Sequence, residues 1–157
     1  MKIIPRNRWD LIILHPVCTA MAHSANAHYA AGKPRYQERL DAIKWTQELW
    51  ELAKQYSDRV ALENPLSVVF QHLNGGKTSW VHPWQHGHPE QKKTGFHLWN
   101  LPPLVPTNDV HAYMMTLDKK DRQKVLSMGP SVHRKRDRST TFPGIATAVV
   151  KQWGPLL

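Results

Sequence analysis

The stretch Trp9-Asp10-Leu11-Ile12-Ile13-Leu14-His15-Pro16-Val17-Cys18 decides how this chain is expected to fold. Its nearly continuous apolar run, which ends before a proline, is typical of a buried strand. A second apolar run, residues 59–62, leads into Glu63-Asn64-Pro65. Between the two runs, residues 35–56 show apolar side chains at three- and four-residue spacing, which predicts a covering helix. A strand–helix–strand unit of this kind has parallel strands, so both strand ends should meet at one edge of a sheet.

The rest of the chain predicts a small α/β domain. Strands are expected over residues 78–81 and 94–99, and a helix from Ile145 to Trp153 with a Gly154 stop. One apolar stripe of the 35–56 helix should face the sheet, and it makes Trp45 a predicted core residue. Its members are Ala42, Trp45, Leu49, Leu52 and Tyr56. We therefore expect a single domain over residues 1–157, with about four strands in a mostly parallel sheet.

The charge of the chain favours a polyanionic partner. The 21 Lys and Arg residues exceed the 12 Asp and Glu residues, giving a formal net charge of +9 at pH 7. Eight basic residues fall between Lys119 and Arg138, against only Asp121 and Asp137. Neutralising phosphates releases counterions and strengthens binding, so we expect a nucleic-acid partner, DNA in the first place. A merely solvated loop is the alternative interpretation of this basic run.

The chain has no signature of a membrane or secreted protein. No apolar run approaches the roughly 20 residues that a membrane helix needs. A single cysteine rules out an intrachain disulfide framework and fits a reducing compartment. We therefore expect a cytoplasmic protein with no membrane partner.

Cys18 is the candidate nucleophile, because the end of a buried parallel strand is where α/β folds place their chemistry. The alternative is a small buried hydrophobic residue, the commoner role of a lone intracellular cysteine. His82, His86 and His88 have a spacing compatible with a metal site. Two prolines and a glycine interrupt that segment, so we expect polar residues lining a groove and no metal.

Both strand ends resemble motifs of cytosine-C5 DNA methyltransferases. His15-Pro16-Val17-Cys18 is similar to their Pro-Cys motif, and Glu63-Asn64-Pro65 is similar to their Glu-Asn motif. Later stretches resemble a compact, often phage-borne branch of the family, so that the resemblance spans nearly the whole chain. These stretches are Pro83 to His88, Lys92 to Thr94, Leu98-Trp99, Leu101 to Thr107 and Thr141 to Ala146.

The resemblance implies a mechanism and its residues. Cys18 would attack C6 of a cytosine that has left the base stack, and Glu63 would contact N3 of that base. Asn64, Lys93 and Thr94 would shape the base pocket, and the Ala-rich segment after Cys18 would be a mobile loop. The methyl donor would be S-adenosylmethionine.

Three further residue groups are candidates for contacts with the nucleic acid. Trp84 is a candidate for stacking on a base, although packing in the core is the alternative. His88 is a candidate for a bond to phosphate or to Glu63. Arg134 and Arg136 are candidates for gripping phosphates.

The resemblance also implies a cofactor-binding segment that we do not find in the sequence. Family members begin with a strand, a Gly-rich turn and an acidic residue that bind the cofactor, whereas only eight residues precede Trp9 here and none is glycine. Gly75-Gly76 lacks the strand–turn–helix context of such a turn, so cofactor-binding residues stay unassigned. We expect a truncated Rossmann-like methyltransferase fold whose exposed strand edge pairs with a second copy or with a partner chain supplying the other half. The alternative is that the Lys2-Ile3-Ile4 segment or the polar insertion over residues 108–138 covers this edge.

The expected function is that of a DNA cytosine-C5 methyltransferase-like protein that does not act alone, working in the host cytoplasm if a phage encodes it. The alternative is a non-catalytic phage protein that binds nucleic acid or interferes with host defence. A metal-dependent hydrolase is a third class. Retention of S-adenosylmethionine would separate the first two classes, and metal content would address the third.

Overall fold

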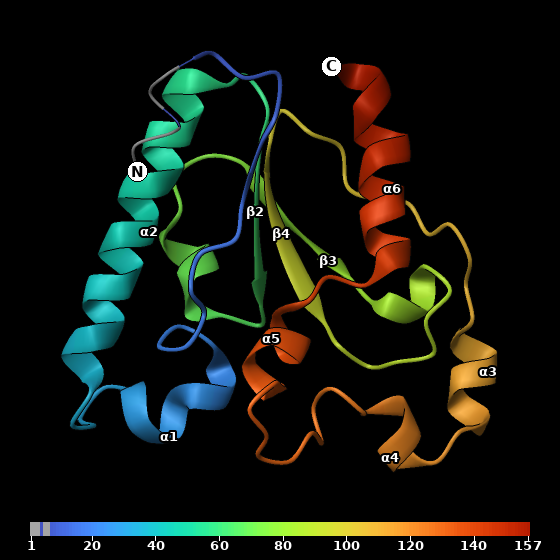
Figure 1. Ribbon diagram of the computed structural model, residues 1–157. Coiled ribbons are helices and arrows are strands. Elements are labelled where there is room, and N and C mark those ends of the chain that lie inside the picture. Colours follow the sequence, from blue (N-terminus) through green and yellow to red (C-terminus); the bar gives the residue numbers. More distant parts are fainter. Residues whose placement is uncertain (1–3, 5–6) are drawn as a thin grey trace. The chain divides into compact units, whose positions relative to one another are not determined.

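The computed structural model describes residue 4 and residues 7–157, and the chain divides into two compact units. The first unit comprises Met1–Trp80 and Thr94–Pro103, and the second comprises Val81–Lys93 and Leu104–Leu157. The architecture is mixed α/β, as expected (Figure 1).

A four-stranded sheet lies at the centre of the first unit. Its strands are β1 (Ile12–Leu14), β2 (Val60–Pro65), β3 (Lys77–Val81) and β4 (Thr94–Trp99), in the order β1-β2-β4-β3. β1 and β2 run parallel, with Ile12 opposite Val60 and Leu14 opposite Leu62. This confirms the prediction that the two strands joined by the long helix are parallel.

The prediction of a mostly parallel sheet is wrong, because β4 inserts beside β2 in the antiparallel direction and the sheet is mostly antiparallel. A parallel connection needs a crossover of a dozen or more residues, usually a helix. Between Pro65 and Thr94 the described chain forms only short 3-10 turns, η3 (Val68–His72) and η4 (Pro83–Gln85), together with β3. No α-helix carries the chain back across the sheet in this segment.

The long helix α2 (Tyr36–Tyr56) covers one face of the sheet and forms the main core with it (Figure 1). Trp50 is fully buried at the centre of this core, and its indole nitrogen donates to the Asn74 carbonyl over 2.9 Å. The predicted placement of Trp45 in the core is wrong: its side chain is 43% exposed. The buried face of α2 includes the polar residues Arg39 and Thr46, which an apolar pattern does not reveal.

His97 is a buried polar residue on the α2 side of β4. Its Nδ1 lies 2.8 Å from the Thr78 hydroxyl, and its Nε2 lies 2.7 Å from the Gly75 carbonyl oxygen. The carbonyl accepts from Nε2–H, so Nδ1 accepts from the hydroxyl and the ring is neutral. Burial lowers the pKa of His97, and the nearby Lys54 charge lowers it further, against the raising effect of the Gly75 bond.

We expect the protein to lose stability as the pH falls through the titration range of histidine. The unfolded chain binds a proton near pH 6.5, where folded His97 remains neutral, so the free energy of unfolding decreases as pH falls. Each such histidine contributes a slope of at most about 1.4 kcal/mol per pH unit. Burial also lowers the pKa of His82 and His86, so their contributions have the same sign.

Urea unfolding at several pH values between 8 and 5 checks this expectation. His97→Gln should show a shallower decline of the unfolding midpoint than the wild type. His28→Gln, which changes an exposed histidine of helix α1 (Asn26–Tyr29), should keep the wild-type slope. Equal slopes in His97→Gln and the wild type would contradict the assignment.

The second unit is built from short helices. These are α3 (His111–Thr116), α4 (Lys119–Arg122), α5 (Arg134–Ser139) and α6 (Pro143–Trp153), followed by the 3-10 turn η5 (Gly154–Leu156). The predicted terminal helix is confirmed: it begins at a proline, as helices often do, and its C-cap is Gly154. Across the described residues, no helix has the length and apolar character required to cross a bilayer.

Candidate functional site

The parallel pairing of β1 and β2 brings the two predicted catalytic motifs to one edge of the sheet. Leu14 lies opposite Leu62, so the next residues in register are His15 and Glu63. Nδ1 of His15 lies 3.1 Å from Oε2 of Glu63. Because side chains alternate along a strand, both residues lie on the sheet face opposite to the α2 core, to which Leu14 and Leu62 belong.

Asn64 anchors the turn that carries Cys18. Its amide nitrogen donates to the carbonyl of Pro16 over 3.1 Å, and the residue is only 1% exposed. Among the described side chains, its Oδ1 is one of the few buried polar atoms without a hydrogen-bond partner. Cys18 follows two residues after Pro16 and is partly buried, and its carbonyl accepts from the backbone nitrogens of Met21 and Ala22.

Arg39 of α2 holds the segment that follows Cys18. Its guanidinium donates to the carbonyls of Ala20 and Ala22 and to the Asn26 side chain, at 2.7, 3.4 and 2.9 Å. The segment forms a 3-10 turn, η2 (His23–Ala25), followed by helix α1. An arginine that is 5% exposed thus ties the Cys18 segment to the core helix.

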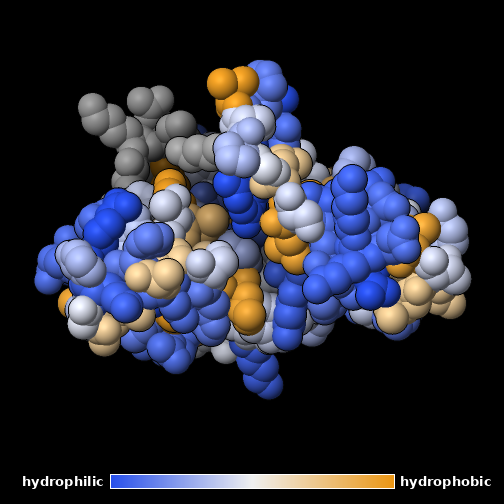
Figure 2. Space-filling model, turned by 90° about the horizontal axis from the view of Figure 1, so that it is seen from below, coloured by the Kyte–Doolittle hydropathy of each residue, from blue (hydrophilic) through white to orange (hydrophobic). Residues whose placement is uncertain are grey.

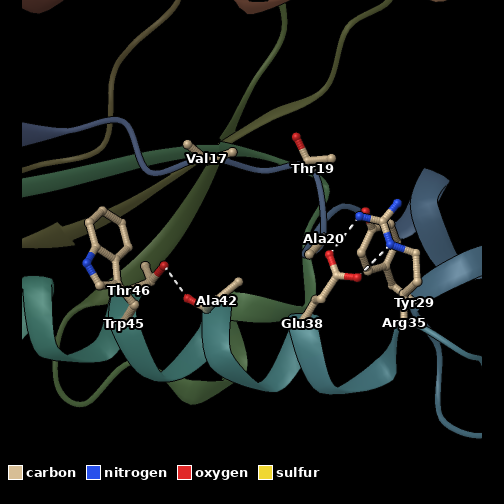
Figure 3. A pocket seen from close by; sticks show the side chains of 9 residues that line it. All are labelled: Val17, Thr19, Ala20, Tyr29, Arg35, Glu38, Ala42, Trp45 and Thr46. Atoms are coloured by element: carbon tan, nitrogen blue, oxygen red, sulfur yellow. Dashed lines mark hydrogen bonds and ion pairs between the residues drawn. The ribbon is translucent and has the colours of Figure 1, made fainter.

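A pocket of about 380 Å³ opens beside the Cys18 turn (Figure 3). Its walls come from the turn, from α2 and from α1, and are lined by Val17, Thr19, Ala20, Tyr29, Arg35, Glu38, Ala42, Trp45 and Thr46. Arg35 donates two 2.7 Å hydrogen bonds to the Glu38 carboxylate, which lowers the pKa of Glu38. The same guanidinium lies 4.5 Å above the Tyr29 ring. The pocket thus offers aromatic and apolar surface, and its two charged side chains, Arg35 and Glu38, form an ion pair with each other.

The described residues do not form the expected S-adenosylmethionine site. Within the described ranges, Gly75 and Gly76 lead into β3 instead of connecting a strand to a helix, and a Cβ at either would meet Trp99 or the Leu98 carbonyl. The one acid that lines the pocket, Glu38, is engaged by Arg35. We therefore assign no residue to the cofactor.

Thr94 joins the first-unit site. It is 6% exposed and lies opposite Pro65 in the β2–β4 ladder, where Asn64 faces Gly95 and Glu63 faces Phe96. Thr94 is thus adjacent to the Glu-Asn motif in the β2–β4 ladder. Lys93, the residue before it, is exposed and belongs to the second unit.

Within the second unit, the stretches that resemble the methyltransferase branch meet around His86 and His88. His86 Nδ1 lies 2.9 Å from the Thr107 hydroxyl, and His88 Nε2 accepts from the backbone nitrogen of Gly144 over 2.9 Å. Lys92 donates to the carbonyls of Arg138 and Thr140, over 2.8 and 3.2 Å. His88 is therefore hydrogen-bonded to Gly144 in the first turn of α6. Its predicted contact with the nucleic acid stays a prediction.

Gly144 is required by this arrangement, because a Cβ there would overlap the His86 carbonyl oxygen and crowd the His88 ring. We expect Gly144→Ala to destabilise the protein by about 1–3 kcal/mol, as an overpacking substitution. Gly154→Ala is the matched control, since no atom lies within 4 Å of a Cβ at that position. Thermal unfolding compares the two, and equal midpoints would contradict the expected crowding.

The nucleic-acid candidates of the second unit lie on short elements. Trp84 is half-buried. Its ring stacks on the His82 ring, with the ring centroids 5.2 Å apart, and meets the His111 ring edge-on, with the centroids 4.7 Å apart. Arg134 and Arg136 lie on α5, where the Arg136 side chain is 73% exposed and pairs with Asp137. Hydrophilic side chains predominate on the face shown in Figure 2, and apolar ones appear in small groups.

No group of three or more His, Cys, Asp or Glu side chains among the described residues has the geometry to hold a metal ion. Comparison with known proteins finds no matching family model, curated protein or solved structure.

Sequence reasoning missed two residues of the first-unit site. No catalytic role was predicted for His15, although the parallel register places it opposite Glu63. The buried position of Arg39 was not predicted, because a charged residue on a helix usually lies on the face exposed to solvent. Its position four residues before Ile43, on the buried stripe of α2, is the signal that could have identified it.

Proposed function

We propose that this chain is a DNA cytosine-C5 methyltransferase-like protein in which Cys18 is the nucleophile and Glu63 contacts N3 of the cytosine. The observation that carries the proposal is the parallel β1–β2 register, which delivers the Cys18 turn and Glu63 to one sheet edge. The bond from Asn64 to the Pro16 carbonyl adds support, because it links the two motifs directly. We also propose that the β1–α2–β2 unit is the catalytic part of a Rossmann-like methyltransferase fold.

In the proposed chemistry, the Cys18 thiolate forms a bond to C6 of a flipped cytosine. The electron pair of the C5–C6 double bond moves toward C5 and the ring, and Glu63 in its acid form donates a proton to N3 as negative charge develops there. Glu63 takes this proton back when the base is restored. C5 then takes a proton from water. Loss of the original C5 hydrogen and departure of the thiolate restore the base, with a solvent hydrogen at C5.

This addition needs only the side chains of this chain and the base. S-adenosylmethionine would supply the methyl group to C5 when it is bound. Because the described residues do not fit that cofactor, we propose that a second copy or a partner chain completes its site. β1 is an edge strand of the described sheet, and edge strands are where a further chain can pair.

Calorimetric titration with S-adenosylmethionine tests the methyltransferase proposal, first without DNA and then with a cytosine-containing duplex. We expect no binding to the protein alone. Binding near micromolar affinity, about 8 kcal/mol, is expected once a completing chain is present. Micromolar binding to the isolated monomer would contradict the proposed dependence on another chain. Absence of binding under every condition, with the duplex still bound, would contradict methyl transfer.

A second candidate function is nucleic-acid binding without catalysis. The observation that favours it is the basic second unit, where α4 and α5 carry several Lys and Arg residues and Trp84 lies half-buried. Binding through phosphates would weaken steeply with salt. This candidate would be preferred if the affinity for a duplex were the same with cytosine and with other bases at every position.

A further inference from the structure

We propose that His15 is a positioning residue for Glu63: its Nδ1–H holds Oε2 of the carboxyl group and leaves Oε1, as the protonated oxygen, to donate to N3 of the base. This inference rests on the proposed function for its substrate. The contact itself is a feature of the fold, with Nδ1 and Oε2 3.1 Å apart.

The surroundings of Glu63 explain why such a partner matters. Its side chain is only 17% exposed, and its neighbour across the β2–β4 ladder is Phe96, which is 2% exposed. A carboxylate shielded from water in this way requires hydrogen-bond donors. His15 supplies one from the adjacent strand.

The backbone holds His15 in place from both sides. β1 ends at Leu14, directly before it, and Pro16 follows it. A residue before proline is restricted to extended backbone conformations, which limits the direction in which the His15 side chain leaves the backbone. On the other side of Pro16, the Asn64 amide clamps the carbonyl.

The imidazole remains accessible while the carboxylate is shielded. The His15 side chain is 53% exposed, so substitutions there should leave the fold intact. The bond at Nδ1 also fixes which ring nitrogen carries the proton in the neutral ring, because Nδ1 must be the donor to a carboxylate.

The test has two arms, of which the first needs no activity. Nitrogen NMR of ¹⁵N-labelled histidine, assigned by loss of the His15 signals in His15→Asn, reports the tautomer at a pH where the ring is neutral. We expect Nδ1–H in the wild type and a shift toward Nε2–H in Glu63→Ala. An Nε2–H tautomer in the wild type, or no change in Glu63→Ala, would overturn the proposal.

The second arm measures hydrogen exchange at C5 of cytosine in an oligonucleotide, without a methyl donor. We expect His15→Phe, which keeps the ring shape but removes the donor, to slow exchange about tenfold or more. His15→Asn, whose amide can donate from a similar position, should recover most of the rate. His28→Phe is the control and should match the wild type.

Alkylation of Cys18 by iodoacetamide is measured on the same variants. A rate within twofold of the wild type in His15→Phe would support action through Glu63. Slower alkylation together with slower exchange would overturn the proposal, because His15 would then act on the thiol or its turn. Unchanged exchange in His15→Phe would overturn it as well. Absence of exchange in the wild type would contradict the proposed function, while the tautomer would still decide whether His15 holds Glu63.

Discussion

Cys18→Ala is expected to abolish hydrogen exchange at C5 of cytosine, lowering the rate at least about a thousandfold, to the uncatalysed background. The thiolate is the atom that bonds to C6, and alanine offers no nucleophile in its place. DNA affinity should stay close to that of the wild type, because the basic residues of the second unit are unchanged. The measurement is release of tritium from an oligonucleotide labelled at C5, with a duplex-binding assay beside it.

Thr19→Ala is the matched control for this substitution. Thr19 is an exposed residue on the same turn, and its change should leave both exchange and binding unaltered. If Cys18→Ala retained measurable exchange while Thr19→Ala lost it, the nucleophile would be misassigned.

Arg39→Leu is expected to destabilise the protein by about 2–4 kcal/mol, because it leaves the partly buried Ala20 carbonyl and the Asn26 side chain without this donor and removes a buried guanidinium from the core helix. The guanidinium serves the carbonyls of Ala20 and Ala22 together with the Asn26 side chain. Arg39→Lys should fall between the wild type and Arg39→Leu, since an ammonium group lacks the planar fork that reaches several acceptors. Urea unfolding measures these differences.

The same substitution has a local consequence for the thiol. Because Arg39 ties down the segment after Cys18, alkylation of Cys18 should become faster in Arg39→Leu. Arg35→Leu is the control: its exposed pair with Glu38 should contribute little, so neither the unfolding midpoint nor the alkylation rate should move. Equal behaviour of the two variants would contradict the role assigned to Arg39.

Local patterns predicted the β1–α2–β2 unit because periodicity and connection length determine it. The helix was predicted over residues 35–56 and spans Tyr36–Tyr56, and its two strands are parallel. The antiparallel direction of β4 was not predictable in this way, because the strand that pairs with the free side of β2 is determined by contacts between residues distant in sequence. An alternating run such as residues 94–99 fits a parallel or an antiparallel ladder equally well.

The site was predicted in part for the same reason. Cys18 follows β1, and Glu63 lies in β2 directly after the last residue that pairs with β1, so the parallel pairing that brings their segments together could be inferred. His15 and Arg39 act through polar contacts that no hydropathy pattern reports. For Trp45 the prediction was wrong in the opposite sense: its large apolar side chain suggested burial, but the residue is exposed. The stripe of α2 that faces the core contains Arg39 and Thr46 instead.

The central claim is that the Cys18 thiol adds to C6 of a cytosine in DNA, and covalent trapping tests it most directly. The probe is an oligonucleotide that carries 2-pyrimidinone, an analogue lacking the 4-amino group and therefore more electrophilic at C6. Mass spectrometry of the digested complex locates the attachment. We predict one oligonucleotide per chain, attached to the peptide that contains Cys18 and absent in Cys18→Ala. An oligonucleotide that binds without forming this adduct, while iodoacetamide still alkylates Cys18, would contradict the account.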